Sequence, residues 1–317
     1  MIQDIQPSVF SNAFDTTPPA DDDMVFAFDG RTFMARDDGG RLMLPNAAEF
    51  WNEGRNSAWC PIRLFSIDDR AFYLAFREES AADGVLGGAP GSAASDAAAP
   101  DTATPDGAPY AAAPSTSPAV DGYNWVENEA IRFAEPFPLR LAAATAWQLS
   151  VWYETSRFCG RCGHVMERDC NERALVCPAC GNRVYPRINP AVIVAVRDGD
   201  RLLMTRYAGP GAYRHRALIA GFCEIGETAE QTVAREVLEE AGVHVKNIRY
   251  YKSQPWGFAS DLLLGFVCDL DGGSELHMDA QELSSAEWVA RADIYEEDDQ
   301  VSLTREMILA FKNGLLE

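Results

Sequence analysis

The segment 221–243 constrains the fold of this chain more than any other part of the sequence. Thr228 is followed three residues later by Gln231, which is the spacing of a capping box and predicts that a helix begins there. Gly242 stands where a left-handed helix end favours glycine, and the residues between are mostly strong helix formers. The apolar residues of this helix have a spacing that predicts one buried face: Val233, Val237 and Leu238.

Three glutamates of the same helix are predicted to share another face. Glu236, Glu239 and Glu240 stand at positions i, i+3 and i+4. Carboxylates this close repel one another unless cations lie among them, and hard oxygen ligands suit Mg²⁺ or Mn²⁺. A solvated acidic face is the alternative for three glutamates alone. Glu227 and Arg235, at fixed distances from them in the sequence, favour a metal site.

A second metal site is predicted from cysteine spacing. Two Cys-x-x-Cys units, separated by fourteen residues, can place four thiolates tetrahedrally around Zn²⁺. Gly163 and Gly181 follow the two units, as the tight turn of a zinc knuckle requires. Four thiolates fill the coordination sphere, so this zinc is predicted to be structural, and the neighbouring His164 is predicted to lie on the surface. The alternative is a reduced cluster without metal. The predicted ligands are Cys159, Cys162, Cys177 and Cys180.

Composition limits the partners and the compartment. The chain has 317 residues and a formal net charge of -21, which disfavours non-specific binding to nucleic acid or to anionic membranes. No apolar stretch reaches membrane-spanning length, and the N-terminus lacks a basic region followed by an apolar run. The remaining four of the eight cysteines are scattered, so a disulfide framework is not indicated and a reducing cytoplasm is predicted.

The first part of the chain has the composition of a small β-rich domain with an insertion. Asp29-Gly30 lies between two β-type runs and predicts a hairpin, and 72–76 is a further strand candidate. Residues 79–121 are rich in Ala, Gly, Pro and Ser, and they are predicted to be a flexible insertion. A helix predicted over 138–153 can pack back on the first strands. We therefore expect an N-terminal domain over 1–155.

The predicted fold class is α+β. A zinc ribbon is expected at 156–185, and an α/β/α sandwich around a mixed sheet at 186–317. The strands of this sandwich are predicted from apolar runs, with 191–196 and 201–205 paired across a turn. A C-terminal helix is predicted to cover the sheet. The remaining elements are expected at 218–222, 243–253, 262–270 and 302–313.

The helix segment resembles the Nudix box, the signature of hydrolases that cut a nucleoside diphosphate linked to another group. Every specified position matches: Gly221, Glu227, Arg235, Glu236, Val237, Glu239, Glu240, Gly242 and Val243. Residues 253–262 resemble the array of the NADH pyrophosphatase family, also known as NAD-capped RNA hydrolases. The zinc ribbon and the Tyr-Pro-Arg sequence at 185–187 are similar to the same family. The resemblance covers roughly 140–317 and is weaker over 1–78.

The resemblance implies a role for many side chains. Divalent metal is held by Glu236 and Glu240, the Ala220 carbonyl and Glu282, and Glu239 completes the cluster. Glu239 or Glu240 is the general base, and Arg235 orients the box carboxylates with Glu227 as its partner. The remaining candidates are implied to contact substrate: Glu172, Tyr185, Ser253, Gln254, Pro255, Trp256, Gly257, Phe258, Ala259, Ser260, Asp261 and Thr304.

The aromatic pair of the array also has an interpretation from the residues alone. Trp256 and Phe258 offer flat faces for a ring of the substrate, and on one strand their i, i+2 spacing puts both on one side. Core packing is the alternative. The array departs from the family at Gly257 and Ala259, where prolines are expected, and at Asp261, where serine is expected. These departures predict a less rigid loop and a negative charge near the substrate.

The expected activity is metal-dependent hydrolysis of NADH or NAD⁺ to AMP and nicotinamide mononucleotide. Removal of an NAD cap from RNA uses the same cut, and the resemblance implies a homodimer. Two alternatives stay open. One is a Nudix hydrolase for FAD, diadenosine polyphosphate or ADP-ribose, and the other is a non-catalytic nucleotide-binding regulator. Intact box glutamates count against the second.

Overall fold

A computed structural model describes residues 1–317 except 40, 53–55, 78–116, 210–214, 296–299 and 317. The chain divides into two compact units. One comprises Ile2–Ala93 and Pro109–Arg187, and the other contains Ile188–Glu317. The domain boundaries predicted between residues 155 and 156 and between residues 185 and 186 remain predictions. The two compact units do not separate the N-terminal strands from the ribbon, because both belong to one unit. Each unit is described by itself below.

The N-terminal unit contains two small sheets and one long helix. The first sheet has the order β1-β6-β7-β2, and the second pairs β3, β4 and β5, with β8 along β4. The predicted hairpin is confirmed, since Phe28 pairs with Phe33 across the turn and Gly30 has φ +55°. The bounds are β1 Phe10–Ser11, β2 Met24–Phe26, β3 Phe28–Asp29, β4 Thr32–Asp38, β5 Arg41–Met43, β6 Cys60–Ile67, β7 Arg70–Phe76 and β8 Asn124–Glu127; the helices are α1 Ala47–Phe50, the 3₁₀ helix η2 Asn128–Phe133 and α2 Pro138–Thr155.

The helix α2 packs back on the first strands, as the sequence predicts. The Trp147 ring lies 5.4 Å from the Phe28 ring, and the Tyr153 ring lies 5.6 Å from the Phe76 ring, centroid to centroid. Tyr153 is buried and the other three rings are partly buried, so these contacts remove apolar surface from water and hold the helix on this unit. The predicted insertion lies outside the described residues up to 116. Its last residues join the N-terminal core, where Ala119 exchanges hydrogen bonds with the Asn56 side chain.

The zinc ribbon is a three-stranded sheet in the order β11-β10-β9. Leu175 pairs with Val184 on one side and with Arg168 on the other. The strands are very short; one cysteine turn precedes β9 and the other lies between β10 and β11. Their bounds are β9 Glu167–Arg168, β10 Leu175–Val176 and β11 Arg183–Val184.

The second unit is a mixed sheet between two helices. Its order is β15-β16-β12-β13-β17, with β14 along β12; β12 and β16 are parallel, and the other pairs are antiparallel. The sequence predicts all of these strands except β17. The bounds are β12 Asn189–Asp198, β13 Arg201–Tyr207, β14 Ile219–Phe222, β15 His244–Trp256, β16 Asp261–Asp271, β17 Leu283–Ala290, the 3₁₀ helix η3 Arg291–Asp293, α3 Ala229–Ala241 and α4 Leu303–Lys312.

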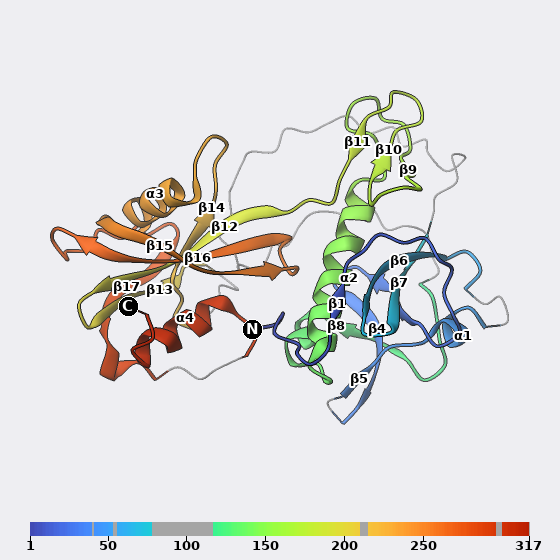
Figure 1. The fold of residues 1–317 in the computed structure, drawn as a ribbon, viewed down its shortest axis with the longest axis horizontal. Helices are drawn as coiled ribbons and strands as arrows, with labels where there is room; N and C mark the ends of the chain where they lie inside the picture. The colour runs from blue at the N-terminus through green and yellow to red at the C-terminus, as the bar shows by residue number, and fades with distance from the viewer. Residues whose placement is uncertain (40, 53–55, 78–116, 210–214, 296–299, 317) are drawn as a thin grey trace. The chain divides into compact units, whose positions relative to one another are not determined.

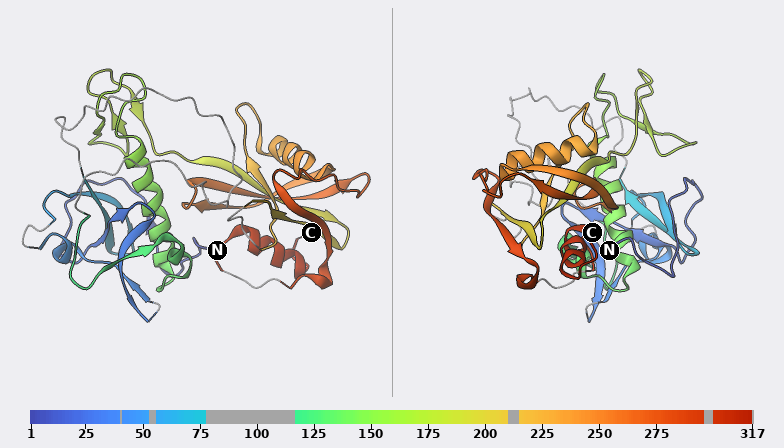
Figure 2. Two further views of the ribbon diagram at one scale, coloured as in Figure 1. Left: turned by 180° about the vertical axis from the view of Figure 1, so that it is seen from behind. Right: turned by 60° about the vertical axis from the view of Figure 1, so that its left-hand side comes forward.

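The two helices cover opposite faces of this sheet, which confirms the predicted α/β/α sandwich (Figures 1 and 2). Phe266 joins the core beneath α3, whereas the next residue back, Gly265, lies against Met307 of α4. Successive residues of a strand point to opposite faces, so α3 and α4 must lie on opposite sides of β16. A Cβ at residue 265 would come within 3.0 Å of the Met307 sulfur, so glycine permits the close approach of α4.

The helix α3 begins and ends as predicted. Thr228 and Gln231 form the reciprocal capping box, and Gly242 has φ 71°. One part of the prediction is wrong: Leu238 is 43% exposed and does not share the buried face of Val233 and Val237. Ala241, one turn beyond Val237, completes that face instead. Adjacent helical residues lie 100° apart, so Leu238 turns away from the sheet. Among the described residues, no helix is long and apolar enough to cross a membrane.

Candidate metal and substrate site

The end of β14 and the helix α3 bring the box residues together. Ala220 and Gly221 pair with Ile193 and Val192 of β12, deep in the sheet. The carboxyl carbon of Glu236 lies against Gly221, where a Cβ would come within 2.0 Å of it. Any side chain at 221 would therefore displace Glu236. This close approach explains why the pattern begins with glycine.

Arg235 holds the carboxylates of the box in place. Its Nε and Nη2 donate to the two carboxylate oxygens of Glu227 at 2.8 and 2.9 Å. Its Nη1 donates to Glu236 at 2.8 Å and to Glu239 at 2.9 Å, and Nη2 also reaches the Phe222 carbonyl at 2.9 Å. The planar guanidinium fits this two-pronged pairing, which an ammonium group cannot reproduce. Arg235 thus fixes the loop before α3 and one side of the glutamate cluster.

Glu240 is buried where a lone carboxylate is costly. The residue is 1% exposed, and its Oε2 has no hydrogen-bond partner among the described residues. The Ala220 backbone N–H donates to this carboxyl group. Burial, followed by the negative charges of Glu236 and Glu282, raises the pKa of Glu240 to about 9. A buried acceptor with no donor and with like charges beside it is the environment that a cation would relieve.

Two other carboxyl groups belong to the same cluster. Burial, together with Glu239 and Glu282, raises the pKa of Glu236 against the opposing effect of Arg235. Burial and the charges of Asp279 and Glu239 raise the pKa of Glu282. Glu282 reaches the cluster because the preceding segment is tied to the end of α3. The Asp279 N–H donates to the Glu240 carbonyl at 3.1 Å.

Asp279 is a member of the cluster that the sequence analysis missed. It adds to the negative charge felt by both Glu240 and Glu282. Its position three residues before Glu282 was a signal, but nothing in the pattern shows that this segment folds against α3. In the structure, backbone hydrogen bonds from 277 and 279 to the last turn of the helix hold the aspartate there.

The cluster fits divalent cations of the Mg²⁺ type. All its side-chain donors are carboxylate oxygens, which such cations prefer. The cluster is wide, since in the described chain only the four ribbon cysteines have ligand atoms all within 4.8 Å of one another. A wide set still suits Mg²⁺, which keeps several waters and uses one or two direct carboxylates. The raised pKa values of Glu236, Glu240 and Glu282 also indicate a cation site, as does the Glu240 Oε2, which has no hydrogen-bond partner among the described residues.

The pairing of Glu227 with Arg235 leads to a testable pH dependence. Hydrogen bonds from Arg235 lower the pKa of Glu227 to about 2, below the usual 4.5. A lowered folded-state pKa means that the pair stabilises the protein above pH 4.5 and loses this effect as the pH falls towards 2. We expect Glu227→Gln to lower Tm at pH 7, and the difference from the wild type to shrink as the pH falls through 4. A difference that stays constant with pH would contradict the pairing.

The four cysteines of the ribbon form a compact cluster in the N-terminal unit. The Sγ–Sγ distances are 3.7 Å between Cys159 and Cys180, and 3.4 Å from Cys162 to both Cys177 and Cys180. A tetrahedron with Zn–S bonds of about 2.3 Å has S–S edges of roughly 3.8 Å. The residues therefore fit Zn²⁺ with small adjustments.

The two knuckles repeat one geometry. The Gly163 N–H donates to the Cys159 carbonyl at 2.8 Å, and the Gly181 N–H donates to the Cys177 carbonyl at 2.9 Å. Both glycines have positive φ, 75° and 70°, which confirms the tight turns expected from the sequence. His164 is exposed, as predicted, and lies outside the cysteine cluster.

The aromatic pair of the array is arranged differently from the prediction. β15 ends at Trp256, and 257–260 form a turn in which Ser260 has φ 64°. Phe258 is therefore not two residues along the same strand, and the i, i+2 argument is wrong. The rings nevertheless meet across the turn, with centroids 4.8 Å apart and planes at 58°. Trp256 is buried and Phe258 is half-buried, so Phe258 has the more accessible face.

The other predicted substrate contacts differ in accessibility. Asp261 is 2% exposed, and its Oδ1 accepts a hydrogen bond from the Asn189 amide at 3.4 Å, so its carboxylate does not face solvent. Gln254 is also buried. Gly257 is buried too. The other candidates in the second unit are at least partly accessible: Ser253, Pro255, Ala259, Ser260 and Thr304.

Glu172 and Tyr185 belong to the N-terminal unit. The Tyr185 hydroxyl donates to the Glu172 carboxylate at 3.1 Å, and Arg183 pairs with the same carboxylate. Tyr185 is 53% exposed, so its ring is available to a partner or ligand. The two residues are thus linked to each other, and the ribbon positions both.

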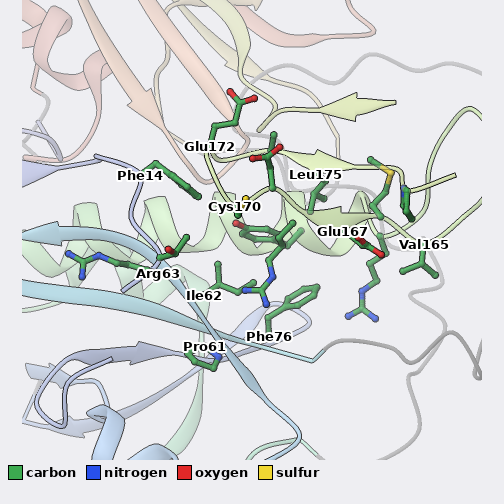
Figure 3. Close-up of a pocket in the computed structure, with 18 of the residues that line it drawn as sticks. Phe14, Pro61, Ile62, Arg63, Phe76, Val165, Glu167, Cys170, Glu172 and Leu175 are labelled. Carbon is green, nitrogen blue, oxygen red and sulfur yellow. The ribbon is translucent and has the colours of Figure 1, made fainter. Parts of the chain in front are cut away.

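The N-terminal unit contains a large cavity (Figure 3). Its volume is about 1100 Å³, and β6, β7, the end of α2 and the ribbon line it. Several of its charges are already matched, since Arg63 lies 3.3 Å from Asp15, and Asp169 pairs with Arg183 at 2.7 Å. The carboxylate cluster, rather than this cavity, is therefore the candidate site for a divalent metal.

Comparison with known proteins agrees with this geometry. The fold and the acidic site define a Nudix domain, and the family model of the NUDIX domain matches residues 187–311. The NADH pyrophosphatase zinc ribbon domain matches residues 154–185. The chain therefore carries a Nudix domain joined to a zinc ribbon of the NADH pyrophosphatase type.

Two curated relatives are the NAD-capped RNA hydrolases NudC of Yersinia pestis (strain Pestoides F) and of Yersinia pseudotuberculosis serotype O:1b (strain IP 31758). Each is 47% identical over 145 residues, which is 44% of this chain and 54% of the relative. The chain thus spans about half the length of the curated relatives it matches. Among solved structures, a NUDIX hydrolase from Nitrosomonas europaea is similar with a TM-score of 0.43 and 21% identity, over 50% of this chain and 91% of that one.

Proposed function

We propose that this protein hydrolyses the pyrophosphate bond of NADH or NAD⁺ and releases AMP and nicotinamide mononucleotide. The proposal rests on Glu240, a buried carboxylate with a partnerless oxygen, set beside Glu236 and Glu282. A dinucleotide brings a doubly charged pyrophosphate, which this acidic site accepts only together with cations. The matched zinc ribbon and the identity to the NudC proteins support NAD(H) as the substrate class.

The side chains divide the work of the reaction. Glu236, Glu240 and Glu282 hold Mg²⁺ or Mn²⁺, with the Ala220 carbonyl as a further ligand. The bound cations supply charge neutralisation at the pyrophosphate and an acidified water. Arg235 keeps Glu236 and Glu239 at fixed positions through its hydrogen bonds.

Glu239 and Glu240 are the two candidates for the general base, and their surroundings differ. The Glu239 side chain is 61% exposed and paired with Arg235, whereas Glu240 is buried among other acids. If a carboxylate acts as the general base but does not hold metal, its mutation lowers turnover and leaves the metal affinity unchanged. Cation titration of Glu239→Gln and Glu240→Gln therefore assigns the roles.

The half-buried ring of Phe258 is the proposed stacking surface for a base of the substrate in the second unit. Tyr185, whose ring is exposed in the N-terminal unit, is a proposed contact by resemblance. Trp256 supports Phe258 from the core. Ser253, Pro255, Ala259, Ser260 and Thr304 are proposed contacts by resemblance. Glu172 is proposed to hold the Tyr185 hydroxyl, which sets the orientation of that ring.

Removal of an NAD cap from RNA is the second candidate, because the similar proteins are named NAD-capped RNA hydrolases. The same bond is cut, and the RNA keeps a 5′-monophosphate. The net charge of -21 counts against strong contacts to the RNA backbone. We also propose, from the resemblance, that the protein is a cytoplasmic homodimer; light scattering measures its mass in solution.

A panel of substrates tests the function. NADH, NAD⁺, ADP-ribose, FAD and NAD-capped RNA are each incubated with Mg²⁺ or Mn²⁺, and the products are resolved by chromatography. We expect AMP and nicotinamide mononucleotide, with kcat/KM for NADH or NAD⁺ above those for ADP-ribose and FAD. Faster turnover of FAD or ADP-ribose overturns the substrate assignment, and no turnover of any compound supports a binding protein.

The segment 79–116 is expected to be dispensable for this activity. It contains no candidate ligand, and its composition offers little apolar surface to bury. Replacing it with a short Gly-Ser linker should leave kcat/KM for NADH within about threefold, because loop length costs little free energy. Residues 117–121 are retained because Ala119 is bonded to Asn56. A large loss of kcat/KM would show that the segment takes part in catalysis.

A further inference from the structure

Gln254 lies in the substrate-binding array but is closed to solvent. The residue is 0% exposed. Its Nε2 donates to the Val301 carbonyl at 2.7 Å, and its Oε1 accepts from the Leu303 N–H at 2.7 Å. One side-chain amide therefore bridges the end of β15 and the start of α4, which are far apart in the sequence.

These two hydrogen bonds fix the first turn of α4. A helix start leaves its first backbone N–H groups without partners inside the helix. The Ser302 hydroxyl accepts from the Arg305 N–H at 3.3 Å, and Gln254 satisfies the Leu303 N–H from outside the helix. Because Gln254 also binds the carbonyl before the cap, it sets both the position and the rotation of this turn.

A second attachment holds α4 one turn further on. The Tyr251 hydroxyl and the Glu306 carboxylate are 3.0 Å apart, and Lys252 pairs with the same carboxylate. Tyr251 and Lys252 lie on β15 and are more exposed than Gln254. This second attachment joins α4 to the same strand without touching residues 301–303, so it offers a control for the role of Gln254.

We propose that Gln254 is a positioning residue for substrate recognition, on the basis of the function proposed above. Pro255 and Trp256 follow it directly on β15, and Thr304 follows Leu303 directly on α4. The amide thus aligns two segments that the resemblance assigns to the substrate. Gln254 acts through the backbone of α4 and makes no contact with the ligand, because it is fully buried.

Two variants of Gln254 test this role. Gln254→Met keeps an unbranched chain of similar length and removes both hydrogen bonds; Gln254→Glu keeps an acceptor for Leu303 but sets a carboxylate against the Val301 carbonyl. For Gln254→Met we expect KM for NADH to rise about tenfold, which corresponds to about 1.4 kcal/mol of substrate binding, with kcat within about threefold. Hydrogen exchange at the Leu303 amide should become faster. Gln254→Glu should give a smaller change in exchange.

Glu306→Gln is the matched control, because it weakens the neighbouring attachment. Its stability should fall while KM stays within about twofold of the wild type. An equal KM change in Gln254→Met and Glu306→Gln overturns the positioning role. A raised KM without faster exchange at Leu303 also overturns it, since that result indicates direct contact. If the wild type does not hydrolyse NADH, the proposed function fails, and the same comparison is made with the dinucleotide that is hydrolysed.

Discussion

Replacing Glu240 by glutamine is expected to lower kcat for NADH at least about a hundredfold while the fold is kept. Loss of residues that only support a metal ligand already costs about 10- to 100-fold, so loss of a ligand should cost more. The pKa of about 9 means that Glu240 carries a proton at neutral pH when no cation is bound. Glutamine resembles this neutral form in size and charge, so the metal-free variant should have a Tm at pH 7 equal to or above that of the wild type.

Three measurements check this expectation. Steady-state kinetics with saturating Mg²⁺ give kcat, and thermal unfolding with and without Mg²⁺ gives the stabilisation by the cation. The increase in Tm on adding Mg²⁺ should be smaller in the variant, because a carboxylate ligand is lost. Glu230→Gln is the control, since Glu230 is an exposed residue in the first turn of the same helix. Turnover of Glu240→Gln within about tenfold of the wild type would rule out a metal-binding role for Glu240.

Loss of the zinc ligands is expected to unfold the ribbon. Cys177 is buried in the four-cysteine cluster, and a filled tetrahedral site contributes directly to folding. Cys177→Ser should contain less than one zinc per chain and should lower Tm by about 10 °C or more, since several kcal/mol are lost. Elemental analysis and calorimetry measure the two effects.

Cys170→Ser is the matched control for the zinc prediction. Cys170 is an exposed cysteine of the ribbon and lies outside the cluster. Its replacement should leave both the zinc content and Tm unchanged. A chain that is purified without zinc and that unfolds at the same temperature after Cys177→Ser would contradict a structural metal. Equal losses in the two variants would show that the effect is not specific to the cluster.

The sequence predicted much of the second unit because local signals there agree with one another. The capping box at Thr228, the left-handed Gly242 and the apolar spacing of Val233 and Val237 all describe one helix, and the structure has it. The strand β17 was not predicted. Polar residues interrupt its apolar ones without a regular alternation, and its pairing with β13 includes a register shift near Arg206. Such a strand is defined by its neighbour rather than by its own pattern.

What the sequence determined by itself was chemistry that depends on local spacing. The members of each cysteine pair, and the three glutamates of the box helix, lie within a few residues of one another, so their order in the chain is enough to predict a cysteine site and an acidic site. The tertiary structure decided everything that depends on burial and on distant partners. It buried Glu240, brought Asp279 to the cluster, turned Leu238 to solvent and ended β15 before Phe258. It also placed the start of α4 beside Gln254. The hydrogen bonds between residue 254 and residues 301–303 form only when the sheet and α4 are packed together.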